Sequence, residues 1–326
     1  MTKLTKAVFA AISIVAASQV TAARAQPKSM TISTASPGGV YAVYGEGLAK
    51  LITERLSIPT STRQTQGPAQ NLMLLMGKST DLALVTTGPA YEAMSGKLEL
   101  APGEKYKDLR VLFAMYPTPF QMVSLKANDI SSLDDLNHKR VGAGPRAGTG
   151  GQYWSRWLPD LGIDCTLSFG GIGDQMDQLA DGRLDAIVTA GGIPHPSIVE
   201  LETTKGAAVF GMSQERLKAL MDKNPYAVQF TIPKGTYKSQ SGDIETVAMW
   251  NFVAVDASMP DDIAYEITKA VFENHDRMVT VHATARDTLA ENIANDTFVP
   301  LHPGAARYYK EIGTEIPAAI APKGQD

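Results

Sequence analysis

Short apolar runs of strand length alternate along this chain with longer segments of helical periodicity, and this alternation limits the possible folds more than any other feature. Residues 30–35 alternate like a strand, and the next segment places Tyr41, Tyr44 and Leu48 on one helical face. Further strand-like runs lie at residues 61–66, 82–86, 140–143, 166–169, 186–189 and 251–255, and helical segments at residues 72–76, 89–94, 154–161, 172–179 and 263–271. Such alternation predicts an α/β fold with mainly parallel sheets.

The pattern also repeats at the level of single residues. The sequence GGVY at residues 38–41 returns as GGQY at residues 150–153. Residues 77–88 contain Gly-Lys, an aspartate, a hydrophobic run, a threonine and a glycine, and residues 182–191 repeat that order with Gly-Arg. Chance similarity between α/β units is one explanation. The other is a pair of lobes of like topology that face each other, with a ligand cleft between them.

Two segments are candidates for the crossings between such lobes. Residues 116–119, Tyr-Pro-Thr-Pro, cannot be the interior of a helix. The strand-like run at 251–255, followed by Pro260 and a helical segment, is the candidate for the return. We therefore predict that lobe one comprises residues 26–118 and 259–326, that lobe two comprises residues 119–258, and that the hinges lie near residues 116–119 and 255–260.

The amino terminus has the three parts of a secretory signal peptide. Lys3 and Lys6 precede an apolar run at residues 7–17, and small residues follow, ending in Ala23-Arg24-Ala25. The apolar run is too short to span a bilayer comfortably. A buried first helix is the alternative, but no polar face interrupts the run. We expect residues 1–25 to be removed by cleavage after Ala25 and the mature chain to be exported to a bacterial periplasm.

Charge, cysteine content and motifs argue against several classes of protein. The net charge of −4 gives no electrostatic footprint for nucleic acid. The single cysteine, Cys165, excludes an intrachain disulfide framework and a Cys-rich zinc site. The sequence contains no H-E-x-x-H pair, no G-x-S-x-G elbow and no Walker A loop. We therefore expect no catalytic residue, no metal and no cofactor.

One motif suggests a dinucleotide site. Gly142, Gly144 and Ala147 fit the pattern G-x-G-x-x-A after a strand. However, Asp164 precedes its predicted strand, whereas the acid that binds a ribose ends one. A Pro-Arg pair also crowds the turn that should lie against a pyrophosphate. The motif therefore does not support a dehydrogenase.

Turns rich in glycine and polar residues follow the predicted strands of both halves. They lie at residues 36–39, 67–68, 86–89, 144–151 and 189–196. In an open α/β sheet, ligands bind outside the carboxyl ends of the strands. Free N–H groups at helix starts favour an anion there, and threonine adds a hydroxyl. These turns predict a cleft that binds a small anion.

Individual side chains in the turns have both a ligand and a packing interpretation. Arg146 is the only arginine or lysine within them and suits a carboxylate, but it also fits a solvated loop. Tyr41 and Tyr153 occupy matching helix starts, where either a ligand contact or a core position is possible. His195 lies between two prolines and either donates a hydrogen bond or packs the turn.

The ordered set of short motifs resembles the TAXI family of TRAP-transporter solute receptors over essentially the whole mature chain. The motifs are residues 38–41, the Gln66-Gly67 turn with Asn71-Leu72, Asp81-Leu82-Ala83 with Val85, the Gly148-Thr149 turn, residues 181–186, Gly191-Gly192 with Pro194, and residues 232–237. The resemblance implies a two-lobed periplasmic binding protein, of a type II-like form, that closes on a solute. It would deliver the solute to a permease driven by an ion gradient. Family members are associated with glutamate, 2-oxoglutarate and related carboxylates.

This chain departs from the family at one turn. The family often has Gly-Ser-Gly-Thr where this chain has Arg146-Ala147-Gly148-Thr149. A hydroxyl is lost and a cation is gained, which would favour a more anionic or larger ligand.

The cleft and the resemblance together predict a monomeric, non-enzymatic receptor for a dicarboxylate or an acidic amino acid. Its partners would be that anion and a TRAP membrane permease. A secreted hydrolase that uses Asp185 or His195, and a sensor or adhesin, are the alternatives. The predicted ligand-binding residues are Gly39, Tyr41, Gln66, Asn71, Thr86, Thr87, Arg146, Gly148, Thr149, Gly150, Gly191 and His195.

Overall fold

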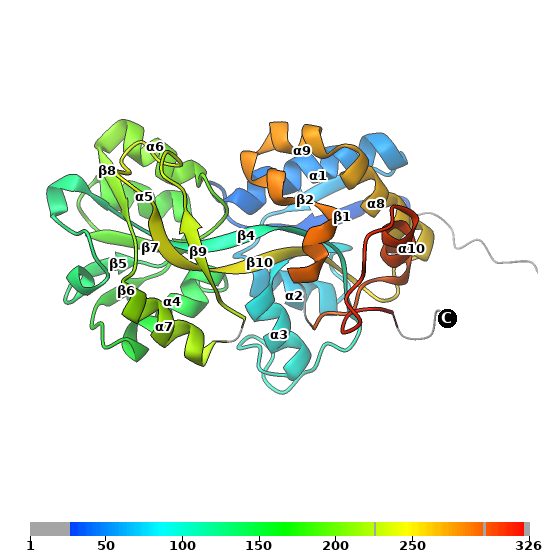
Figure 1. Ribbon diagram of the computed structural model, residues 1–326, viewed down its shortest axis with the longest axis horizontal. Coiled ribbons are helices and arrows are strands. Elements are labelled where there is room, and N and C mark those ends of the chain that lie inside the picture. Colours follow the sequence, from blue (N-terminus) through cyan, green and yellow to red (C-terminus); the bar gives the residue numbers. More distant parts are fainter. Residues whose placement is uncertain (1–26, 225, 296–297, 323–326) are drawn as a thin grey trace, which may run out of the picture.

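Two lobes lie side by side in the computed structural model, which describes residues 27–224, 226–295 and 298–322 (Figure 1). Two long antiparallel strands, β4 (Leu109–Leu125) and β10 (Ile244–Asp256), run through both lobes. Helices and strands alternate in each lobe, which confirms the predicted α/β class with two lobes. The predicted signal peptide lies outside the described residues.

The first lobe is built on three parallel strands. The strand β1 (Met30–Ser33) pairs with β2 (Thr60–Arg63) and with β3 (Leu82–Thr86). The helices that follow these strands are α1 (Val40–Leu56), α2 (Pro68–Met76) and α3 (Thr87–Ser95). The carboxyl-terminal helices α8 (Asp261–Glu273), α9 (His275–Val281) and α10 (Pro303–Glu311) return to this lobe.

The second lobe repeats this plan. The strand β5 (Arg140–Gly142) pairs in parallel with β6 (Thr166–Ser168) and with β7 (Ala186–Ala190). The helices α4 (Thr149–Asp160), α5 (Ile172–Ala180) and α6 (Pro196–Lys205) follow these strands in turn. In both lobes the first strand is therefore central, with the second on one side and the third on the other. This shared order shows that the sequence echo reflects like topology.

Three further elements complete the second lobe. The strand β8 (Ala207–Phe210) pairs with β4, and β9 (Val228–Ile232) pairs with β10. The helix α7 (Gln214–Lys223) lies between them in the chain. The central path of the sheet is β2-β1-β3-β10-β4-β7-β5-β6.

Each lobe has its own hydrophobic core. Leu48, Phe113 and Phe252 belong to the core of the first lobe. In the second lobe, Phe120 packs against Trp154 and Trp157 on one side of the sheet. A separate cluster that includes Ile187 and Ile198 forms the other side. Every one of these side chains is buried.

The crossings between the lobes are strands, and one of them lies earlier than predicted. Pro117 and Pro119 are part of β4, where they pair with Trp250 and Ala248 of β10. The chain therefore crosses back near residues 248–251, not near 255–260. Phe252–Val255 already belong to the core of the first lobe, so the predicted limit of lobe two at residue 258 is too late. The prediction treated the apolar run as the crossing itself, whereas that run is buried beyond it.

Candidate functional site

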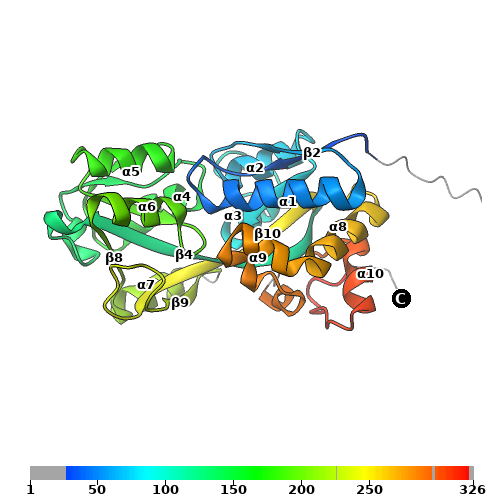
Figure 2. The same ribbon diagram turned by 90° about the horizontal axis from the view of Figure 1, so that it is seen from above.

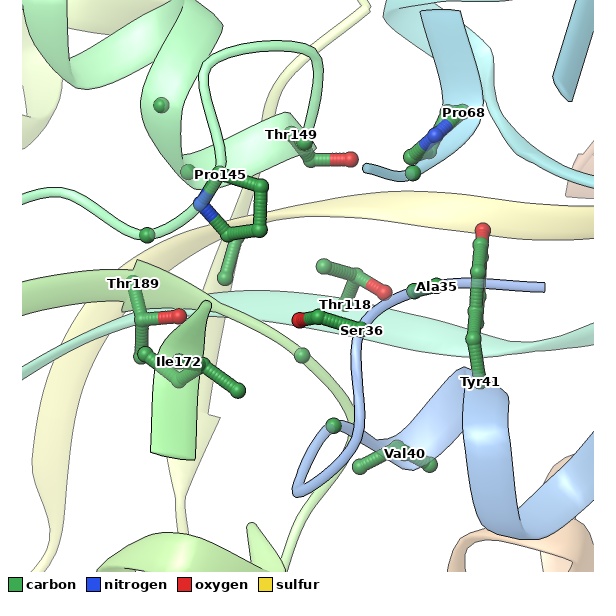
Figure 3. Close-up of a pocket in the computed structure, with 18 of the residues that line it drawn as sticks. Ala35, Ser36, Val40, Tyr41, Pro68, Thr118, Pro145, Thr149, Ile172 and Thr189 are labelled. Atoms are coloured by element: carbon green, nitrogen blue, oxygen red, sulfur yellow. The ribbon is translucent and has the colours of Figure 1, made fainter. Parts of the chain in front are cut away.

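A cavity of about 70 Å³ lies between the lobes (Figure 3). It is found at the carboxyl ends of four strands, where Ala35, Thr86, Ala143 and Ala190 line it. Figure 3 shows Pro145 and Thr149 of the second lobe on one side and Pro68 of the first lobe on the other. Thr118 of β4 and Asn251 of β10 also line the cavity. These two strands connect the lobes and are called the hinge strands below, and they form the floor of the cavity.

Six helices begin at this cavity, and none has a side-chain cap. Their N-cap residues are Gly39, Gly67, Thr86, Gly148, Gly171 and His195. The first N–H groups of a helix have no carbonyl partner within the helix. Among the helices that begin elsewhere, Ser213 caps α7 and His302 caps α10 with their side chains, whereas α8 and α9 also lack a side-chain cap. The starts of α1, α3, α4 and α5 therefore leave N–H donors around the cavity. The starts of α2 and α6 contribute fewer, because Pro68 and Pro196 have no N–H and the N–H of Ala69 donates to the carbonyl of Ala147.

No ionised side chain lines the cavity within the part of the chain that the structure describes. The first turns of α1, α2, α3, α4 and α6 also lack an acidic residue. The exception is α5, whose Asp174 lines an adjoining outer pocket that shares Ser36, Gln66 and Pro145 with the cavity. Each helix start carries the equivalent of about +0.5 charge. The electrostatic potential in the cavity is therefore set by helix dipoles of one sign.

His195 adds no charge at neutral pH. Its side chain is buried at the start of α6, and this burial lowers its pKa to about 4, with His282 nearby contributing in the same direction. The Nδ1 atom of the ring has no hydrogen-bond partner among the described residues. The backbone N–H of His195 donates to the hydroxyl of Tyr237 at 2.8 Å. The imidazole is therefore held neutral beside the cavity.

Hydroxyl groups from both lobes meet at the cavity. The Oγ1 atoms of Thr86 and Thr149 are 3.0 Å apart, although they belong to different lobes. The Tyr41 hydroxyl donates to Oδ1 of Asn251 at 2.6 Å. Asn251 in turn donates from Nδ2 to the carbonyl of Tyr116 at 2.6 Å and to the Thr118 hydroxyl. This chain of bonds joins α1 to both hinge strands directly beneath the cavity.

Most residues predicted to bind the ligand line the cavity. They are Gly39, Tyr41, Gln66, Thr86, Gly148, Thr149, Gly150, Gly191 and His195. Whether each of them contacts a solute stays a prediction.

Three predicted residues do not line the cavity, and each has another role. Asn71 is fully buried in the first lobe, where its Nδ2 donates to the carbonyls of Thr34 and Leu84. Thr87 donates instead to the carbonyl of Tyr226 at 3.4 Å.

Arg146 is the third of these residues, and it lies at the outer pocket. Its guanidinium stacks over the ring of Phe169 at 3.9 Å from the ring centre. A contact between Arg146 and the solute stays a prediction, since the outer pocket adjoins the cavity. Only Pro145 of the pair reaches the cavity.

Sequence reasoning missed several lining residues. They are Ala35, Ser36, Val40, Gly67, Pro68, Thr118, Ala143, Gly144, Pro145, Gly151, Ile172, Thr189, Ala190 and Asn251. Most of them lie in the turns that were singled out, so the turn pattern contains the signal. Thr118 and Asn251 are different, because only the pairing of β4 with β10 reveals that they face the cavity.

The lobes are in contact across the cleft, so this is a closed conformation. The N–H of Ala69 in the first lobe donates to the carbonyl of Ala147 in the second at 3.3 Å. Ser197 of α6 donates from Oγ to the carbonyl of Gly38 at 2.8 Å. A Cβ atom added at Gly67 would lie 2.8 Å from Cα of Gly148. The two turns therefore meet backbone to backbone.

A polar clasp holds the rim of the closed cleft. Oε1 of Glu92 on α3 accepts hydrogen bonds from the Tyr153 hydroxyl at 3.0 Å and from Nη1 of Arg156 at 2.8 Å. The Glu92 side chain is only 6% exposed, whereas that of Arg156 is 44% exposed. Glu92 belongs to the first lobe and the other two residues to α4 of the second. The clasp therefore joins the two lobes in this closed conformation.

Of the two residues that the hydrolase alternative would use, His195 lines the cavity and Asp185 does not. Asp185 precedes β7 and pairs with Arg140 at 2.6 Å, at the opposite end of the strand from the cavity. Among the described residues, no group of three or more His, Cys, Asp or Glu side chains is placed to hold a metal.

The helices of the described chain include none that is long and apolar enough to cross a membrane.

Known proteins share this architecture. The protein MatC of Rhodopseudomonas palustris, with bound malate, has a TM-score of 0.56 and 15% identity over 79% of this chain and 88% of that chain. An ancestral arginine-binding protein bound to arginine has a TM-score of 0.49 and 15% identity over 79% of this chain and 98% of that chain. For a putative L-cystine ABC transporter from Listeria monocytogenes the TM-score is 0.49 and the identity 16%, over 81% of this chain and 96% of that chain.

The architecture and the sequence lead to two conclusions. The likeness to MatC and the two-lobed topology identify a periplasmic-binding-protein-like fold of type II. Residues 32–313 match the model of the NMT1-like family, and because this match spans most of the sequence, the chain belongs to the NMT1-like family.

Proposed function

We propose that this protein is an exported receptor that captures a small organic anion and delivers it to a membrane permease. The convergence of uncapped helix starts from both lobes on a cavity without ionised side chains carries this proposal. The N–H groups and the dipoles of these helices favour a negative charge. The buried surroundings also lower the local dielectric constant, which strengthens that interaction.

The lining argues against a cation as the solute. A buried ammonium or guanidinium group needs a carboxylate or a ring of acceptors. Asp174 is the acidic residue nearest to this role in the described chain, but it lines the outer pocket. Because the cavity has no acid, it also suits an anion without an amino group better than an amino acid. We therefore favour a carboxylate such as a hydroxy or oxo dicarboxylate over glutamate.

The size of the cavity limits the solute. In the closed state it measures about 70 Å³, whereas a cavity needs about 10–15 Å³ on a comparable measure to hold one water molecule. Only a small solute fits beneath the meeting turns without moving them. This supports a compact carboxylate over an oligosaccharide or a peptide.

The sequence resemblance to the TAXI family supports the transport role. In that family a periplasmic receptor serves a TRAP permease, and the apparent signal peptide of this chain agrees with export. The malate bound to MatC, whose fold is similar, also agrees with an organic anion. We propose a TRAP-type permease as the partner and the monomer as the working form.

A thermal-shift screen of the mature protein tests the anion directly. A solute at a hundred times its dissociation constant should raise the free energy of unfolding by about 2.7 kcal/mol. Malate, 2-oxoglutarate and glutamate form the test panel, with arginine and glucose as controls for charge. We expect stabilisation by dicarboxylates and none by the controls. If only arginine or glucose stabilises the protein, the proposed function is wrong.

A further inference from the structure

A second hollow lies behind the hinge, on the face of β4 and β10 that is turned away from the cavity. This hinge groove has a volume of about 710 Å³. Its walls include Pro117 and Trp250 of the two hinge strands, Pro194 and Phe230 of the second lobe, and Arg286 of the first lobe. Figure 2 shows α2 and α5 on one side of β4 and β10, and α9 and β9 on the other.

Strand geometry explains why the hinge serves two separate sites. Successive side chains of a strand point to opposite faces of the sheet. Thr118 and Asn251 face the cavity, and the preceding residues, Pro117 and Trp250, line the hinge groove. Pro117 and Trp250 are also direct partners in the register of the two strands. Thr118 and Asn251 therefore form part of the wall of the cavity, and Pro117 and Trp250 form part of the wall of the hinge groove.

The opposed positions couple the two sites mechanically. Both lobes contribute walls to the cavity and to the hinge groove, and the two hinge strands lie between these two hollows. Bending that brings the lobes together at the cavity moves them apart at the hinge groove. A molecule seated in the groove therefore resists opening of the cleft. Gly192 of the second lobe already packs closely against Thr284 and Tyr116 beside this groove, because a Cβ atom there would lie 2.6 Å from Thr284 Oγ1.

The lining of the groove indicates the kind of molecule that it accepts. The rings of Trp250 and Phe230 offer flat apolar surface, and Lys234 and Arg286 supply cations from opposite lobes. Neither cation forms a salt bridge with another described residue, and Nε of Arg286 donates to the carbonyl of Ala283 at 2.9 Å. Asp287 is the acid in the wall, and burial raises the pKa of its carboxyl. The rings and the excess of cations suit a flat anion.

We propose that the hinge groove is a second ligand site, for a planar aromatic anion, and that its occupation favours the closed lobes. Aromatic side chains bind flat rings by stacking, and arginine binds carboxylates through its planar fork. Because coupling between two sites is reciprocal, the groove ligand and the solute in the cavity each increase the affinity for the other. The site would let a second compound in the same compartment adjust solute capture.

Calorimetric titration with naphthalene-2-carboxylate tests the site without any knowledge of the transported solute. The groove variant combines Lys234→Gln and Arg286→Gln, and the matched control combines Lys218→Gln and Arg183→Gln, which are exposed cations elsewhere on the second lobe. We expect the groove variant to bind the probe about tenfold more weakly than the unaltered protein. The control variant should bind it within twofold of the unaltered protein.

Two comparisons separate the groove from the cavity. A carboxylate that stabilises the protein in the thermal-shift screen should not displace the probe, and by the coupling it should strengthen binding of the probe. Displacement of the probe by that carboxylate, or equal affinities in the groove and control variants, would overturn the proposal. Small-angle scattering with the probe alone should show a smaller radius of gyration, and an unchanged or larger radius would refute the coupling.

Discussion

A charge placed at the first residue of α4 gives the sharpest test of the anion site. Thr149 lines the cavity, and its hydroxyl is 3.0 Å from that of Thr86 across the cleft. We compare Thr149→Asp with Thr149→Asn, because the two side chains have nearly the same shape and differ by one charge. Both variants lose the threonine hydroxyl, so that loss cancels in the comparison.

The expected difference follows from electrostatics. Two like charges about 4 Å apart repel by about 4 kcal/mol at an effective dielectric constant near 20. Thr149→Asp should therefore bind the anion about a thousandfold more weakly than Thr149→Asn. Stability should move the other way, because an acid in the first turn of a helix contributes about 0.3–1 kcal/mol through the dipole. A misfolded variant would not combine weaker binding of the anion with a higher free energy of unfolding.

Calorimetric titration with the best carboxylate from the screen, together with urea unfolding of the unliganded variants, measures both effects. As a control, the folded fraction of each variant is measured at the protein concentrations used in the titrations. If the two variants bind the carboxylate within twofold of each other, the solute does not place its charge near the start of α4. If Thr149→Asp instead gains affinity for a cationic solute, the sign assigned to the electrostatic potential in the cavity is wrong.

Four further outcomes follow from the structure. Arg146→Ala should change the affinity for a small carboxylate by less than twofold in calorimetry, because the guanidinium lies outside the cavity; a thirtyfold loss would return it to the site. Glu92→Gln should weaken binding about fivefold by loosening the clasp with Arg156, at a cost of about 1 kcal/mol, and an unaltered affinity would contradict this. Tyr116→Phe should raise the free energy of unfolding in urea by about 1 kcal/mol, because its buried hydroxyl has no hydrogen-bond partner among the described residues; a decrease would show that the hydroxyl is satisfied. The free energy of unfolding should fall as the pH drops from about 6.5 to about 4, because the unfolded chain then binds a proton that the folded chain excludes from His195. His195→Asn should flatten this part of the pH profile. An unchanged slope would assign the pH dependence to other groups.

The sequence predicted the local features of the site well, because they depend on short-range chemistry. A glycine-rich turn between a strand and a helix is recognisable from its residues, and the carboxyl ends of parallel strands meet at one edge. Gly39, Gly148 and His195 were therefore selected, and the structure places all three at the cavity. The repeat of GGVY as GGQY likewise predicted two lobes of like topology.

Features that depend on long-range pairing were beyond the sequence pattern. Pro117 and Pro119 lack the N–H that a sheet uses, so the segment was taken for a break in secondary structure, although β4 continues through it. Asn251 was placed in a strand, but only its pairing partners show that it faces the cavity. The elements β8, β9, α7 and α10 were not among the predicted segments.

The orientation of single side chains was also out of reach. Arg146 and Pro145 are neighbours in one turn, yet the first stacks on Phe169 and the second lines the cavity. Asn71 follows a predicted binding turn, but its amide links Thr34 to Leu84 inside the first lobe. A motif locates a turn, whereas the packing around the turn decides which side chain points inward.

The meeting of Gly67 and Gly148 has a consequence for the proposed delivery to a permease. These turns approach each other through their main chains, so they would set the end point of closure. A cargo small enough to lie beneath the two turns would leave the outline of the closed receptor the same. A permease that recognised this outline would respond to closure and not to the identity of the cargo, and the choice of cargo would then rest with the receptor.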